Sequence, residues 1–204
     1  MPELVVEEVR DQGLLALMRE ASAGCYCRFW HFSGDDNAWQ ARCNRDASVN
    51  RSELEEALRT GHAEARGLVA LLDGEVVGWL KLAPASSMEK IRTRRLYRTL
   101  PCFATPRAGV YVIGCVLVRP DARRQGVARA LIAASVDAVR AWGGRALEAL
   151  PRVASSATRD DELWTGPLQP FLEAGFVQVD GPDAYPVLRF ELVEDDACSA
   201  SPHA

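Results

Sequence analysis

Residues 109–142 read GVYVIGCVLV, RPDA, RRQGVA and RALIAASVDAVRAW in succession. The first ten residues are apolar and rich in Val and Ile, which predicts a buried strand over 109–118. RPDA is a turn signal. Apolar side chains then recur at helical spacing over 126–142. We therefore expect a strand, a short turn and a helix in direct sequence.

The turn of this unit has the properties of a phosphate cradle. The start of a helix offers unpaired backbone N–H groups in a positive local field. Gly126 lets a ligand approach the backbone, and the small Ala128 keeps the first helical turn open. Arg123 and Arg124 add positive charge. The segment therefore predicts a pyrophosphate site.

The flanking sequence predicts further strands and helices around this unit. Asp73-Gly74, between two apolar runs, is typical of a tight hairpin turn. The basic run 88–99 indicates a surface helix or loop, and 24–50 is the least regular part of the chain. Strands are expected at 5–9, 67–72, 75–82, 146–150, 176–179 and 185–192, and helices at 13–23, from Asn50 or Ser52 onward, and at 167–174.

The hexapeptide 123–128 and its context resemble the GNAT superfamily of acyl-CoA-dependent N-acetyltransferases, whose signature is Arg/Gln-x-x-Gly-x-Gly/Ala after a strand. The sequence FLEAGF at 171–176 is similar to the closing helix and Gly-Phe junction of that family. The resemblance covers about 67–192. It implies an α/β fold with a mixed, mostly antiparallel central sheet that is splayed between the fourth and fifth strands and flanked by helices.

The resemblance also implies the organisation and the activity of the chain. Residues 1–192 would form a single acetyltransferase domain, with divergent acceptor-side elements in 1–66 and an acyl-CoA-binding core in 67–192. The acidic tail 193–204 is expected to be flexible. The activity would be transfer of an acetyl or short acyl group from acetyl-CoA to a primary amine of a small molecule or peptide, by direct attack in a ternary complex. Dimers are common in the superfamily, so a homodimer is compatible with it.

Positions that match the family motif would bind the cosubstrate. The fourth strand would contact the pantetheine arm, and the backbone N–H of Val116 would meet the thioester carbonyl. Trp164-Thr165-Gly166-Pro167 would lie near the cofactor, at the start of the closing helix. The expected acyl-CoA contacts are Val116, Leu117, Val118, Arg123, Arg124, Gln125, Gly126, Val127, Ala128 and Arg129.

The residues for proton transfer follow the family pattern less closely. Glu148 occupies a position on the fifth strand where some relatives place a glutamate general base, although it could equally face solvent or form a salt bridge. The tyrosine that usually acts as general acid is replaced by Phe171. The thiolate would then be protonated by water, Tyr185 or Tyr111. Alternatively, the chain has lost catalysis and acts as a non-catalytic acyl-CoA-binding or sensing domain.

Composition excludes several other classes of protein. The chain has 204 residues, 48% of them hydrophobic, and 24 Lys and Arg against 28 Asp and Glu give a net charge of −4. This balance argues against nucleic acid or an anionic membrane as a partner. The beginning of the sequence has no signal-peptide pattern, and no apolar run approaches a membrane span. A reduced, cytoplasmic protein is therefore expected.

Two further clusters admit a plain and a specific interpretation. The cysteines of 25–43 with His31 could form a zinc site in a metal-binding regulatory protein, but their spacing is not a common metal pattern, and core packing is favoured. Cys115 is likewise expected to pack. The aromatic cluster at 26–32 could line an acceptor pocket or simply cover the sheet. The basic run 90–98 is expected to be solvated rather than to bind an acidic group.

Overall fold

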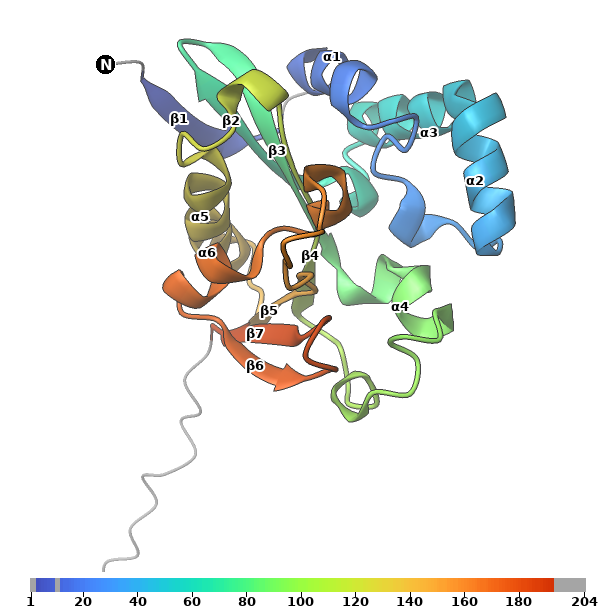
Figure 1. Cartoon of the computed structure of the whole chain (residues 1–204), viewed down its shortest axis with the longest axis vertical. Coiled ribbons are helices and arrows are strands. Elements are labelled where there is room, and N and C mark those ends of the chain that lie inside the picture. The colour runs from blue at the N-terminus through green and yellow to red at the C-terminus, as the bar shows by residue number, and fades with distance from the viewer. Residues whose placement is uncertain (1–2, 10–11, 193–204) are drawn as a thin grey trace, which may run out of the picture.

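The computed structural model describes residues 3–9 and 12–192, which form one sheet in the strand order β1-β2-β3-β4-β5-β7-β6 (Figure 1). β4 and β5 run parallel, and every other neighbouring pair is antiparallel. The expected mixed sheet of an α/β protein is confirmed. The strands are β1 (Leu4–Glu8), β2 (Gly67–Leu72), β3 (Glu75–Pro84), β4 (Val110–Val118), β5 (Ala146–Ala149), β6 (Val177–Asp180) and β7 (Val187–Glu191).

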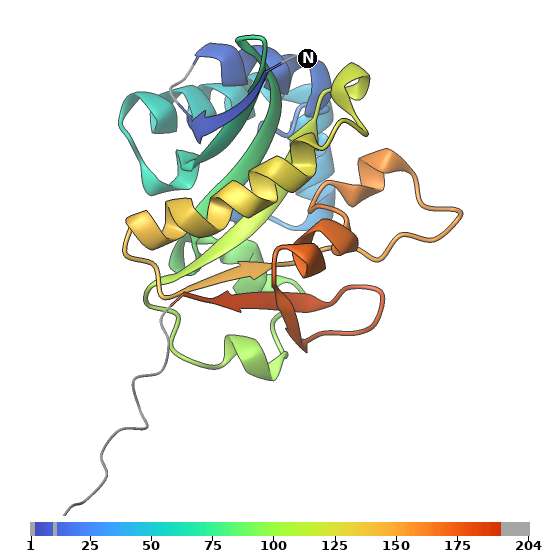
Figure 2. The ribbon, with the colours of Figure 1, turned by 90° about the vertical axis from the view of Figure 1, so that its left-hand side faces the viewer.

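Helices cover both faces of the sheet (Figure 2). One face packs against α5 and α6, and the other against α1 and α3, while α2 and α4 enclose a third apolar cluster beside β4. The apolar stripe expected over 126–142 is the buried face of α5. The bounds are α1 (Gln12–Ala21), α2 (Asp36–Arg45), α3 (Ala47–Arg59), α4 (Glu89–Thr93), α5 (Val127–Ala141) and α6 (Leu168–Glu173).

Residues 24–59 are more helical than the sequence pattern suggested. The irregular stretch contains α2, whose N-terminus is capped by Asp35: its Oδ1 accepts from the Ala38 N–H at 2.8 Å. The helix expected from Asn50 or Ser52 already begins at Ala47. The period of α2 is obscured because it buries only Trp39 and is otherwise polar.

The basic run 88–99 is not solvated throughout. Lys90 is buried, its ammonium lies 5.4 Å from the ring centre of Phe29 and 5.3 Å from that of Phe32, and it donates to the Gly34 carbonyl. The prediction of a fully solvated run was therefore wrong at Lys90, because aromatic rings from a distant segment cover its stem and face its charge. The predicted acidic tail 193–204 lies outside the described residues.

The sheet opens between its fourth and fifth strands, as expected from the family resemblance. β4 and β5 pair from Val110↔Ala146 to Ile113↔Ala149, and β5 then ends while β4 continues to Val118. Within the described part of the chain, the edge of β4 that faces β5 thus has no strand beside it beyond Ile113. At the same point the β3–β4 register shifts, and the carbonyl of Gly114 accepts from Trp30 Nε1 at 2.6 Å.

The packing of α5 on the sheet is tested by truncating one side chain. Leu131 is fully buried between α5 and the sheet. We expect Leu131→Ala to lower the free energy of unfolding by about 2–5 kcal/mol, because the change leaves a cavity in the core. Arg140→Ala on the exposed face of the same helix should change it by less than about 0.5 kcal/mol. Denaturant unfolding measures both, and equal effects would contradict this packing.

Candidate functional site

A large cleft, with a volume of about 1270 Å³, begins at the N-terminus of α5 and extends past the open edge of β4 to α2. Of the expected acyl-CoA contacts, all except Gln125 line it. Gln125 instead donates to the carbonyl of Asp121 at 3.0 Å. The remaining walls of the cleft come from α2 and from the segments after α1, α4, β5 and β6, including Phe29, Trp39, Arg94, Tyr97, Arg152, Trp164 and Tyr185.

One end of the cleft is the open start of α5, beside an arginine without an ion pair among the described residues. Gly126 caps α5 with φ +84°, and a Cβ built there meets nothing within 4 Å, so there is room over the backbone. Arg123 pairs with Asp160 at 2.8 Å, and Arg129 with Glu173 at 2.8 Å. Arg124 has no ion-pair partner among residues 3–9 and 12–192. This charge and the free helical N–H groups suit a polyanion.

The middle of the cleft lies at Val116. Its N–H points away from β3 and donates to the Trp164 carbonyl at 2.8 Å. This pairing occupies the donor that was expected to meet a thioester carbonyl. The segment after β5 therefore covers this part of β4 in the structure, as the expected position of Trp164 near the cofactor implies.

The position of Glu148 differs from the one expected of a general base. Its side chain is fully buried, does not line the cleft, and pairs with Arg107 and Arg189, whose Nη1 lies 3.3 Å from Glu148 Oε1. Arg189 faces it directly across the β5–β7 register. Both of its oxygens are thus held by guanidinium groups rather than presented to the cleft. These contacts argue against the predicted catalytic role and favour the salt-bridge alternative.

The residues considered as proton donors to the thiolate differ in their position relative to the cleft. Phe171 is fully buried against Phe176, with ring centres 5.4 Å apart. Tyr111 does not line the cleft, and its hydroxyl accepts from Arg66 at 3.1 Å. Tyr185 does line the cleft. Tyr97, which the sequence did not single out, lines it too, but burial raises its pKa to about 12.

The aromatic cluster 26–32 mainly covers the sheet. Of its aromatic residues only Phe29 lines the cleft, while Tyr26 and Trp30 are buried in the two apolar clusters on that face. The cluster thus covers the sheet as one interpretation predicted, and whether Phe29 also contacts an acceptor stays a prediction. Trp39 on α2 completes the aromatic wall, and the capping signal at Asp35 was the sequence feature that could have revealed it.

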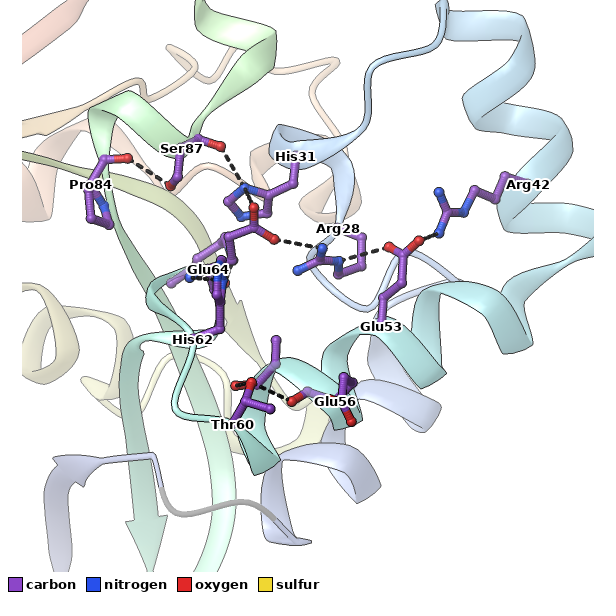
Figure 3. A network of polar contacts seen from close by, with 12 residues as sticks. Arg28, His31, Arg42, Glu53, Glu56, Thr60, His62, Glu64, Pro84 and Ser87 are labelled. Atoms are coloured by element: carbon purple, nitrogen blue, oxygen red, sulfur yellow. Dashed lines mark hydrogen bonds and ion pairs between the residues drawn. The ribbon is translucent and has the colours of Figure 1, made fainter.

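A polar network holds this cluster against α3 (Figure 3). Arg28 donates to Glu53 at 3.1 Å and to Glu64 at 2.7 Å, and Arg42 on α2 also pairs with Glu53. His31 Nδ1 lies 2.8 Å from the Ser87 carbonyl, so this nitrogen carries the proton. The network fixes the wall of the cleft that is formed by residues 24–45.

Cysteines contribute to the same wall. Cys25, Cys27, Cys43 and Cys115 all line the cleft. No group of three or more His, Cys, Asp or Glu side chains in the described part of the chain is arranged to hold a metal ion. The zinc alternative therefore has no support there.

Comparison with known proteins supports the family that the hexapeptide and the open sheet indicate. Residues 16–163 match the acetyltransferase (GNAT) family. The chain belongs to this family. The match begins well before residue 67, so the N-terminal segment also fits the family pattern. No protein with a curated description has a significant sequence match to this GNAT protein.

Solved structures share the fold of this GNAT protein at low sequence identity. The PaiA N-acetyltransferase of Thermoplasma acidophilum in complex with coenzyme A has a TM-score of 0.54 and 9% identity, with 92% of this chain and 99% of that chain covered. A GNAT family acetyltransferase of Brucella melitensis in complex with acetyl-CoA has a TM-score of 0.51 and 19% identity, with 95% and 90% covered. An N-acetyltransferase of Staphylococcus aureus has a TM-score of 0.53 and 13% identity, with 94% and 99% covered. Among the described residues of this GNAT protein, none of the helices is both long and apolar enough for a membrane span.

The ion pairs of Glu148 lead to a first prediction for this site. Glu148→Gln keeps the shape of the side chain but leaves Arg107 and Arg189 without a carboxylate in a buried place. We expect the free energy of unfolding to fall by roughly 3 kcal/mol. Glu56→Gln, at an exposed pair with Arg59, should leave the free energy of unfolding nearly unchanged, because solvent screens that pair. An unchanged free energy of unfolding for Glu148→Gln, measured in denaturant, would show that its ion pairs with Arg107 and Arg189 do not stabilise the fold.

His31 leads to a prediction about pH. Burial, assisted by the charge of Lys81, lowers the pKa of His31 to about 2 in the folded chain. In the unfolded chain the imidazole has its ordinary pKa near 6.5, so below that pH the unfolded chain binds a proton that the folded chain does not bind. This difference should destabilise the fold by about 1.4 kcal/mol for each pH unit below 6.5. His31→Asn keeps a donor for the Ser87 carbonyl but does not titrate. Compared with the unmodified protein, it should show a shallower loss of stability between pH 6 and 4, measured by denaturant unfolding at each pH, and a parallel loss would overturn this assignment.

Proposed function

We propose that this chain transfers an acetyl or other short acyl group from acetyl-CoA to a primary amine, by direct attack in a ternary complex formed within a single domain, 1–192. The observation that carries the proposal is one continuous cleft that joins the N-terminus of α5, the open edge of β4 and the aromatic wall at α2. Relatives of the same fold in complex with acetyl-CoA or coenzyme A support it.

The residues of the cleft fit the cosubstrate from end to end. The free N–H groups after Gly126 and the charge of Arg124 would hold the pyrophosphate, and Arg123 would add to the field. The pantetheine arm of acetyl-CoA would lie along Val116, Leu117 and Val118 on the open edge of β4. Acetyl-CoA supplies the activated acyl group, and the protein supplies its position.

The N–H of Val116 would polarise the thioester carbonyl once its bond to the Trp164 carbonyl opens. The acceptor would enter from the side of Phe29 and Trp39, where an apolar wall favours an uncharged amine. With Glu148 held by arginines, water in the cleft would take the proton of the amine. Tyr185, at the wall of the cleft, is our candidate for returning a proton to the thiolate.

A non-catalytic acyl-CoA-binding or sensing domain is the second candidate. The observation in its favour is Phe171, which is fully buried and places a ring without a hydroxyl where the family usually has its acid. Both candidates require binding of acetyl-CoA, and only the first requires turnover.

Acetyl-CoA binding and turnover therefore test the two candidates in order. Acetyl-CoA at a hundred times its dissociation constant should stabilise the protein by about 2.7 kcal/mol, seen as a rise in Tm. Turnover is then measured as release of free CoA thiol with a panel of small amines and peptides. This assay distinguishes the acetyltransferase from the sensing domain. No rise in Tm removes both candidates, and binding without turnover on any amine favours the sensing domain.

Arg124→Gln tests the phosphate end of the cleft. Arg124 is exposed and makes no ion pair with any other described residue, so its loss should leave the fold unchanged. We expect acetyl-CoA affinity to fall about tenfold, the loss of one charge-assisted contact of about 1.5 kcal/mol. Arg140→Gln, at the far end of α5, is the matched control and should bind normally in isothermal titration. Equal affinities for the two variants would place the phosphates elsewhere.

A further inference from the structure

Two cysteines that line the cleft, Cys27 and Cys115, come from distant parts of the chain. Cys27 belongs to the loop after α1 and Cys115 to β4, where it immediately precedes Val116. Both are free thiols that line the cleft and belong to one buried cluster on this face of the sheet, and an interaction between the two thiols shifts the pKa of each. The two side chains are therefore neighbours, and a small molecule that enters the cleft can reach them.

The strand register explains why polar groups surround this pair. Lys81 on β3 lies opposite Cys115, and Trp79 lies opposite Leu117, so alternate residues of both strands face the loop that carries Cys27. Trp79 Nε1 donates to the Cys27 sulfur at 3.2 Å. The Lys81 side chain is fully buried, and its ammonium donates to the Glu64 carbonyl. A donor and a fixed positive charge thus face Cys27.

These contacts make the two thiols unequal. The hydrogen bond from Cys115, the charge of Lys81 and the Trp79 donor lower the pKa of Cys27 against the opposing effect of burial. The pKa of Cys115 is raised, first by the same hydrogen bond and then by burial. Burial also raises the pKa of Cys25, which lies nearby, to about 12. Cys27 is thus the thiol of this group whose thiolate is favoured.

We propose that Cys27 and Cys115 form a site of oxidation by hydroperoxides. The Cys27 thiolate attacks the terminal oxygen of the peroxide, the O–O bond breaks, and the alcohol or water leaves with one proton, so that Cys27 becomes a sulfenic acid. The Cys115 thiol then displaces hydroxide, which leaves as water with the thiol proton, and the S–S bond forms. The bond ties the loop after α1 to β4 beside Val116.

The geometry assigns different parts to the two residues. Cys27 reacts first because its sulfur accepts from Trp79 Nε1 beside the Lys81 ammonium group, which favours the thiolate. Cys115 is the resolving thiol because it lies in the same buried cluster and its thiol interacts with that of Cys27. Cys102, which donates its backbone N–H to Asp180 at 2.9 Å and does not line the cleft, is the internal control.

The test uses the reduced full-length protein treated with hydrogen peroxide and mapped by peptide mass spectrometry. We expect a crosslink between the peptides of Cys27 and Cys115, reversed by dithiothreitol. In Cys115→Ser, oxidation should stop at a sulfenic acid on Cys27 that a cyclic dione traps. In Cys27→Ser, Cys115 should react at least about tenfold more slowly than Cys27 does in the unmodified protein, because a thiolate reacts and a thiol does not. Cys102→Ser should leave the crosslink unchanged.

Three results would overturn the proposal: a main crosslink that joins Cys27 to Cys25 or Cys43, reaction of Cys115 in Cys27→Ser as fast as that of Cys27 in the unmodified protein, or dione labelling of Cys102 at the rate of Cys27. Thermal unfolding of each reduced variant verifies that the serine substitutions keep the fold. If Cys27→Ser unfolds, Cys115→Ser still tests which residue forms the sulfenic acid. The readout is mass alone, so it is independent of whether the cleft binds acetyl-CoA.

Discussion

The parting of β4 and β5 after the Ile113–Ala149 pair is the constraint on which the site depends. Backbone N–H and C=O groups must find partners, and a strand that continues past the end of its neighbour exposes a row of them. Here β4 extends five residues beyond its last pair with β5, from Gly114 to Val118. The cleft lies along that row, and the Trp164 carbonyl occupies its central donor. The same opening allows the start of α5 to face one end of the cleft and α2 the other.

Buried ion pairs hold the two sides of this opening in place. Glu148 joins β5 to β7 through Arg189 and to the segment before β4 through Arg107. On the other side, Arg28 links the loop after α1 to α3 and to the segment at Glu64. A buried charge is stable only when it is paired, so each group is costly to remove singly. These ion pairs therefore hold the walls of the cleft, and a backbone hydrogen bond from Val116 to the Trp164 carbonyl joins the segment around Trp164 to β4.

The local patterns of the sequence were enough to predict the core. Each strand had an apolar run, and the hairpin at Asp73-Gly74 follows from two residues that both adopt positive φ, +50° and +83°. The turn and helix start at the α5 end of the cleft were also predictable, because their groups are neighbours along the chain. The other end was not. α2 lacks a strong apolar stripe, and Glu148 looked like a base because its partners lie 41 residues away on either side in the sequence.

The sequence by itself determined the strand–turn–helix unit at 109–142 and, through it, the family, because a glycine at the start of an apolar helix is a local signal. The tertiary structure alone decided which side chains share the cleft. It paired Glu148 with two arginines away from the lining of the cleft, covered Lys90 with aromatic rings, and brought Cys27 and Cys115 into one buried cluster. The physical reason is that charge, burial and reactivity depend on neighbours in space, and those neighbours are set by the packing of the whole chain.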